Sequence, residues 1–130
     1  MAIKAWSWMG HQTEEELTHH TLQAMARATK LADMAVQLLS REQMAGILRS
    51  RRPIRDLHAL CREGLDPTTH IQTTLSRREL WQDALNLILD LTTRLPLITS
   101  ATVKIPVRRQ FKARLRAQLS RRTSPATNTP

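Results

Sequence analysis

The sequence predicts an all-α protein, a bundle of about five helices that ends in a basic amphipathic helix. Apolar residues recur at three- and four-residue spacing over long segments, capping-box motifs precede three of these segments, and only three glycines interrupt the 130 residues. The chain is long enough to bury a core without disulfide or metal support, and its one cysteine, Cys61, can form no internal disulfide. We therefore expect one domain in a reducing compartment.

The composition divides the chain into four parts. Residues 1–12 form an apolar N-terminal arm with two tryptophans, which either docks on the core or anchors the protein to a partner or a membrane surface. Residues 13–100 form the helical bundle, and residues 101–122 form a basic linker and helix. Residues 123–130 have no apolar periodicity and are expected to be disordered.

The first predicted helix begins at Thr13, which forms a capping box with Glu16. Two adjacent apolar stripes run along this helix, so its apolar face is too wide for a helix on the protein surface. We expect it to lie centrally in the bundle, or else to supply the face of a homodimer. The first stripe comprises Leu17, Thr21, Ala24, Ala28, Leu31, Ala35 and Leu38, and the second comprises Leu22, Met25, Ala32, Val36 and Leu39.

Two shorter helices are predicted next. Ser40 and Gln43 repeat the capping pattern and indicate a short second helix. Pro53 suits the first turn of a third helix, because its fixed backbone angle is already helical and its missing amide is not needed there. We expect this helix to end at Gly64 in a left-handed cap.

The most apolar segment follows. Asp66 predicts a further short turn of helix up to Leu75, and Ser76 with Glu79 forms a third capping box that starts a long helix ending before Pro96. This helix is the expected core partner of the first one. Its predicted inward face comprises Leu80, Ala84, Leu87, Ile88 and Leu91.

The C-terminal part carries the charge. Residues 97–107 are rich in β-branched side chains and are interpreted as an irregular linker, because a single strand would have no partner. In the helix that follows, Val107, Phe111, Leu115 and Leu119 lie at fourfold spacing. The last thirty residues contain eight Lys and Arg and no Asp or Glu, so they hold nearly all of the net charge of +9. The basic character therefore belongs to a C-terminal arm.

This arm is the strongest functional candidate. Its cations could bind the phosphates of RNA, an acidic groove of another protein or an anionic membrane surface. The plain alternative is an apolar stripe packed on the bundle with solvated cations on its outer face. Ser124 follows two arginines in a pattern typical of kinase sites, and its phosphorylation would lower the charge of the arm. The candidate binding residues are Arg108, Arg109, Lys112, Arg114, Arg116, Arg121 and Arg122.

No constellation of residues predicts catalysis, a cofactor or a metal. The three glycines are too scattered for a phosphate-binding loop, and no serine lies in a glycine-flanked elbow. His58 and Cys61 would share one helical face, but two further zinc ligands with suitable spacing are missing. No apolar run reaches the length of a membrane span. We expect a protein that is not an enzyme and makes no integral membrane contact.

The segment 76–100 resembles the C proteins of paramyxoviruses, in particular those of the morbillivirus type. The matching positions are Ser76, Glu79, Ala84, Leu87, Ile88, Leu89, Leu91, Arg94, Leu97 and Ser100. The excess of Arg over Lys and the absence of Tyr are typical of a gene that overlaps another reading frame, as the genes of this family do. Members of the family are small, basic, helical viral accessory proteins.

The resemblance implies an antagonist of interferon-dependent innate immunity that also modulates viral RNA synthesis. Its partners would be host signalling proteins and viral replication proteins, in the host cytoplasm or nucleus. Family members carry their basic residues at the N-terminus, whereas here these residues lie at the C-terminus. No functional residue is therefore transferred from the family. The alternative function is an RNA-binding helical module that uses the basic C-terminal arm.

Overall fold

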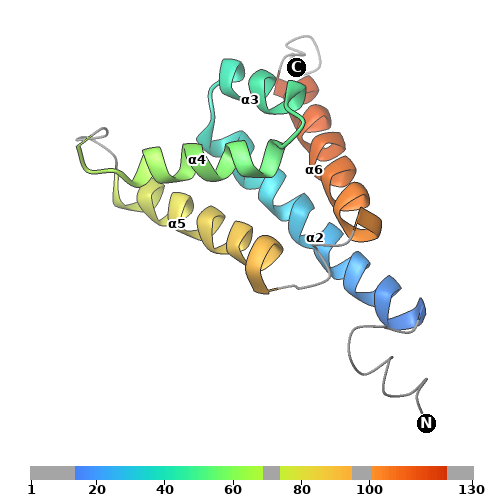
Figure 1. Cartoon of the computed structure of the whole chain (residues 1–130). Coiled ribbons are helices and arrows are strands. Elements are labelled where there is room, and N and C mark those ends of the chain that lie inside the picture. Colours follow the sequence, from blue (N-terminus) through green and yellow to red (C-terminus); the bar gives the residue numbers. More distant parts are fainter. Residues whose placement is uncertain (1–13, 69–73, 95–100, 123–130) are drawn as a thin grey trace, which may run out of the picture.

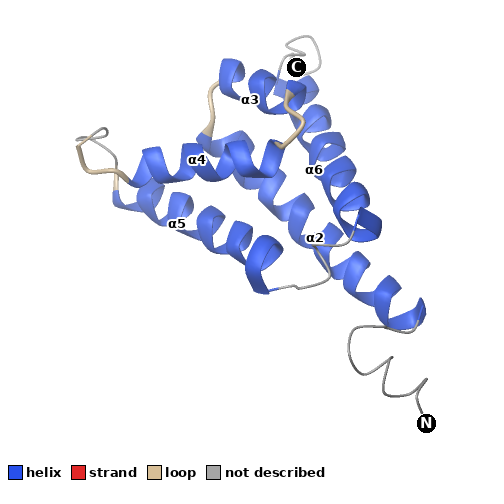
Figure 2. Ribbon diagram, in the orientation of Figure 1, coloured by secondary structure: helices blue, strands red, loops and turns tan. Residues whose placement is uncertain are grey.

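The computed structural model describes residues 14–68, 74–94 and 101–122, and all regular structure in these ranges is helical (Figure 2). This confirms the predicted all-α bundle of about five helices. The elements are α2 (Glu14–Leu38), α3 (Arg41–Arg49), α4 (Pro53–Leu65), α5 (Leu75–Leu89), a π-helical turn η1 (Asp90–Arg94) that continues α5, and α6 (Ala101–Arg122). The predicted N-terminal arm with the Thr13 cap, and the predicted tail with Ser124, lie outside the described residues.

Helix α2 is the central element of the bundle, as its wide apolar face predicts. It packs against α5 and η1 with one part of that face and against α6 with another (Figure 1). The first predicted stripe supplies the buried Ala24, Ala28, Leu31, Ala35 and Leu38. In the second stripe, Ala32 and Leu39 are buried but Leu22 is 61% exposed, because the first turns of α2 extend beyond the other helices.

Helix α6 lies beside α2 and runs in the same direction. Thr29 on α2 contacts Gln110 on α6, and one turn further Asp33 contacts Arg114, so that both pairs are separated by 81 residues. The side chains of α6 that enter the core are Val103, Val107, Phe111 and Leu115, and Leu119 packs against them half-buried. The predicted fourfold stripe is thus part of the core.

The expected linker at 97–107 is wrong over its second half. Helix α6 already begins at Ala101 and includes Pro106. Burial of Val103 against the core favours the helix more than its β-branched side chain disfavours it, since helix propensity is a weak preference. Pro106 lies in the second turn, where its missing amide interrupts the hydrogen bonding of that turn only.

The short helices α3 and α4 begin where the sequence predicts. Gln43 N donates to Ser40 Oγ at 3.2 Å and Ser40 N donates to Gln43 Oε1 at 2.9 Å, which completes the capping box of α3. Pro53 is the first residue of α4. Gly64, however, lies inside α4 rather than in a left-handed cap. A Cβ atom there would be 2.5 Å from the ring of Trp81, so this glycine permits the close approach of α5.

The start of α5 also differs from the prediction. Its N-cap is Thr74, whose hydroxyl oxygen accepts from Arg77 N at 3.2 Å, and Ser76 lies within the first turn. Asp66 Oδ1 accepts from Thr68 N at 2.9 Å in a local turn, and the rest of the predicted helical turn, residues 69–73, lies outside the described part.

The inward face of α5 is rotated from the predicted one. The buried residues of α5 and η1 are Trp81, Ala84, Ile88 and Leu91, whereas Leu80 and Leu87 are half-buried. The reason is Trp81, whose large ring packs on Gly64 and sets the orientation of the helix.

Candidate functional site

The predicted cations of the C-terminal helix lie on different sides of α6. Arg114 faces α2, whereas Arg108 faces the start of α4. The side chain of Arg122 lies outside the described part. The remaining candidates extend outward: Arg109, Arg116 and Arg121 are exposed, and Lys112 is half-buried.

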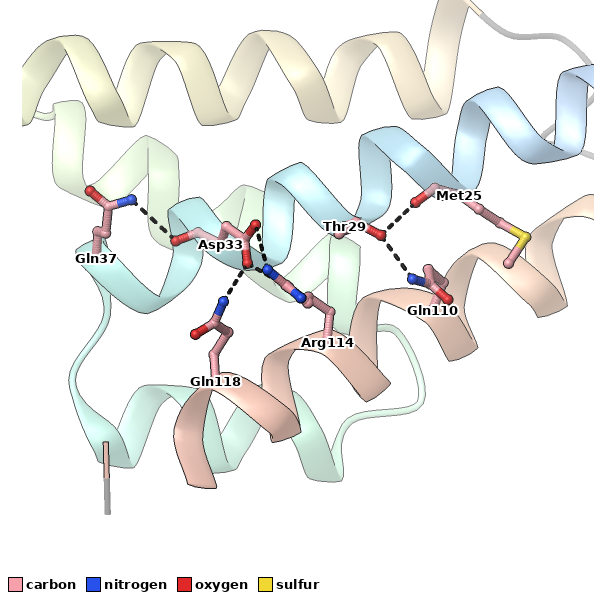
Figure 3. A network of polar contacts seen from close by, with 7 residues as sticks. All are labelled: Met25, Thr29, Asp33, Gln37, Gln110, Arg114 and Gln118. Carbon is pink, nitrogen blue, oxygen red and sulfur yellow. Dashed lines mark hydrogen bonds and ion pairs between the residues drawn. The ribbon is translucent and has the colours of Figure 1, made fainter. Parts of the chain in front are cut away.

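Toward α2, polar side chains form a seam of hydrogen bonds along the two helices (Figure 3). Arg114 Nε donates to Asp33 Oδ1 at 2.8 Å, and Gln118 Nε2 donates to the same oxygen at 2.8 Å. The hydrogen bond from Arg114 is the main reason that the pKa of Asp33 lies below its ordinary value. Gln118 and Arg121 lower this pKa further, whereas burial raises it. Arg114 is thus neutralised within the bundle, and we remove it from the candidate binding residues.

Another cation with a structural position is Arg77, which sequence reasoning did not single out. Its Nη2 donates to the carbonyl oxygen of Leu38 at 2.7 Å, and Nη1 donates to that of Gln37 at 3.4 Å. These carbonyls belong to the last turn of α2, where positive charge is favourable. The guanidinium also lies 6.0 Å from the ring centroid of Trp81.

On the opposite side, α6 forms a groove with the start of α4 and with the junction of α5 and η1. The groove has a volume of about 520 Å³. Its floor comprises Pro53, Ile54, Ile88, Leu91, Thr92 and Val107. Its rim comprises Arg51, Arg52, Arg55, His58, Lys104 and Arg108. We call this feature the basic groove.

The electrostatics of the basic groove favour an anion. None of the described residues that line it is Asp or Glu, whereas four are Arg and one is Lys. The amino end of α4 adds the partial positive charge of a helix terminus at Pro53. Arg108 Nη1 donates to the carbonyl oxygen of Arg51 at 3.3 Å, and this contact joins the two walls of the groove.

The floor of the groove is built at an irregular point of the helices. Leu91 and Thr92 belong to the π-helical turn η1, in which Thr92 Oγ1 donates to the carbonyl oxygen of Ile88 at 2.9 Å. On the other wall, Pro106 directly precedes Val107 within α6.

Among the described residues that line the basic groove, the sequence predicts only Arg108 as a binding residue. Lys104 falls in the expected linker, and in the segment of α4 the sequence singles out His58 and Cys61 rather than the arginines. A signal was present, because residues 49–55 contain four arginines. Only the fold brings this arginine-rich segment against α6.

Cys61 and His58, which the sequence places on one helical face, differ in burial. Cys61 is buried in the core and burial raises the pKa of its thiol to about 12, so it is neither a nucleophile nor a metal ligand at neutral pH. His58 lines the groove, and it therefore does not share a site with Cys61. The described residues contain no group of three His, Cys, Asp or Glu side chains that could hold a metal ion.

Two further observations bear on partners. None of the described helices has the length and apolar character needed to cross a bilayer. The resemblance of segment 76–100 to the paramyxovirus C proteins stays a prediction that rests on the matching positions and the composition of the chain. The whole chain shows no significant match to a protein family, to a curated protein or to a solved structure.

Proposed function

We propose that the protein is a non-enzymatic RNA-binding module that contacts phosphates with a row of cations along α6. The observation that carries this proposal is a row of cations next to the buried stripe. Each of the four core residues of α6 is followed directly in the sequence by a cation, and these cations are Lys104, Arg108, Lys112 and Arg116.

The geometry of this row suits a polyanion. Helix rise separates successive members by about 6 Å, so that the row extends over about 18 Å along α6. At the end of the row near Lys104, the arginines of the basic groove extend the positive surface. Helix α6 contains no acidic residue that would weaken this field. A basic stripe on one face is the electrostatic feature that phosphate-binding proteins share.

Binding through this row is expected to depend on salt and to be insensitive to base sequence, because phosphate contacts carry no sequence information. Four contacts to single-stranded RNA correspond to a loss of about fifty-fold in affinity between about 50 and 200 mM salt. The resemblance to the paramyxovirus C proteins implies a role in viral RNA synthesis, and this role favours RNA over DNA as the ligand.

The test uses fluorescence anisotropy with labelled single-stranded RNA of mixed sequence and the double variant K112E/R116E. The matched control is R62E/R78E, which removes two exposed cations of α4 and α5 and changes the net charge by the same amount. The quantity compared is the salt slope, the decrease of log affinity with log salt concentration, to which each phosphate contact contributes about 0.7. We expect the α6 variant, which loses two contacts, to lower this slope by at least about 1.4 and the control to leave it near the wild-type value. Equal losses in both variants would overturn the proposal.

The viral accessory role is a second proposal, supported by where the resembling segment lies. Segment 76–100 includes Ile88 and Leu91, which form part of the floor of the basic groove. In this proposal the protein antagonises interferon signalling and modulates viral RNA synthesis, in the host cytoplasm or nucleus, through host signalling and viral replication proteins. An interferon-responsive reporter and a viral minigenome assay test it. Expression without effect in both assays would contradict the role.

A further inference from the structure

The basic groove offers something that the cationic row of α6 does not, a recessed apolar floor. Ile88, Leu91 and Val107 belong to this floor and are nearly fully buried, and the half-buried Ile54 belongs to it too. The volume of about 520 Å³ falls within the range of sites that enclose a small ligand or a few side chains. A phosphate backbone alone would leave such a floor unused.

The lining of the floor argues against an RNA base. Proteins that hold unpaired bases stack them on aromatic side chains or on the planes of guanidinium groups. Among the described residues that line the groove, His58 is the one aromatic ring. The guanidinium groups lie on the rim, and the floor is aliphatic apart from Thr92. An aliphatic or aromatic side chain of a polypeptide suits these surroundings better than a base.

We infer that the basic groove docks an acidic segment of a partner protein, with an apolar anchor residue on the floor and carboxylates on the rim. Four arginines on the rim supply planar, paired donors that match carboxylates. An apolar anchor in a pocket surrounded by polar contacts is the usual arrangement of an energetic centre in an interface. This inference goes beyond RNA binding, because it assigns a second partner to the groove, which shares Lys104 and Arg108 with the row.

The test begins with a selection of random peptides displayed on phage against the purified full chain. We expect enrichment of sequences in which one or two Leu, Ile or Phe residues are flanked by Asp and Glu. Peptides from the selection are then synthesised and their affinities are measured by fluorescence anisotropy. Each is compared with a version whose apolar anchor is replaced by Ser.

The groove variant for this experiment is R55E/K104E. Both side chains are exposed, and both lie near the amino end of their helix, where an acid is favourable, so the fold should persist. The matched control is K112E/R116E, with the same change in net charge on α6 outside the groove lining. Circular dichroism on heating verifies that both variants remain folded.

We expect the groove variant and the Ser-substituted peptide each to weaken binding by about tenfold or more, and the control by less than about threefold. An absence of acidic sequences among the selected peptides would overturn the inference. Equal weakening by the groove variant and the control would overturn it too, since binding would then follow net charge alone. A third outcome would overturn it as well: binding to vesicles that contain phosphatidylserine depends on Arg55 and Lys104, whereas binding to no peptide does.

The experiment also separates this inference from the proposed RNA binding. K112E/R116E should weaken RNA binding and leave the peptide bound, so that one function can fail while the other stands. If K112E/R116E instead weakens peptide binding as much as it weakens RNA binding, the peptide binds the cationic row of α6 and its assignment to the groove is wrong.

Discussion

The two long sides of α6 carry similar polar residues but meet their neighbours in opposite ways. Toward α2, Arg114 is held by the carboxylate of Asp33 within a closed seam. Toward α4, Arg108 donates only to a backbone carbonyl, that of Arg51, and the rim around it holds further cations. The comparison teaches that a cation of this helix is structural where another helix places an acid against it, and available for binding where none does.

The largest expected effect concerns the stripe between these two sides. Phe111→Ala removes a fully buried ring from the core and should lower the free energy of unfolding by about 3–5 kcal/mol. Urea denaturation followed by circular dichroism measures this loss. If α6 were a removable arm, the substitution would unfold α6 alone. Cooperative destabilisation of the whole bundle therefore distinguishes a core helix from an arm.

The next effect concerns the last turn of α4, where α4 and α5 approach closely. Gly64→Ala places a Cβ atom against Trp81 and should destabilise the protein by about 1–3 kcal/mol. Gly46→Ala is the matched control, because no heavy atom lies within 4 Å of the added Cβ. In the helix interior this control should stabilise the fold by about 0.5–1 kcal/mol. Thermal unfolding that ranks the two variants the other way would contradict the packing described.

A smaller effect is expected in the seam. Because the pKa of Asp33 is lowered in the folded state, its contribution is fully present above the ordinary aspartate pKa of about 3.9 and is lost as pH falls through the lowered value. Asp33→Asn should therefore destabilise the protein at neutral pH by at most about 1 kcal/mol, since the pair is partly exposed. Urea denaturation over a pH series should show the difference from wild type shrinking in acid. A stability difference between wild type and variant that stays constant with pH would contradict an ionic origin of the stabilisation.

The smallest effect is expected on the groove side. Arg108→Gln should change the free energy of unfolding by less than about 0.5 kcal/mol, because the exposed guanidinium contacts only one backbone carbonyl. The same denaturation measurement at pH 7 compares it directly with Asp33→Asn. A larger loss for Arg108→Gln would remove the distinction between the two sides of α6.

The parts of the fold that the sequence predicts correctly are those decided by local patterns. The capping box at Ser40 and the fourfold stripe beginning at Val107 depend only on residues within the same helix. The start of α6 and the role of Gly64 depend on neighbours that are distant in the sequence. Burial of Val103 overrides a β-branched pattern, and the ring of Trp81 explains a glycine that resembles a helix cap.

The candidate site is predicted only in part, and for the same reason. Composition locates the cations of α6, but Arg114 and Arg108 have identical chemistry and similar sequence surroundings. What separates them is Asp33, which lies 81 residues from Arg114. The rim of the basic groove likewise joins Arg55 to Lys104 across the bundle. Without the helix arrangement, a count of charges cannot assign either residue to a site.

The burial of Cys61 gives the molecule a built-in reporter of its own motions. The thiol is the single cysteine of the chain, is fully covered within α4 and has a pKa of about 12, so a thiol reagent reacts only when this helix opens. The labelling rate therefore measures the free energy of that opening without an added probe. Because α4 also forms one wall of the basic groove, a ligand that occupies the groove slows the labelling of Cys61. The labelling rate therefore reports the binding of that ligand.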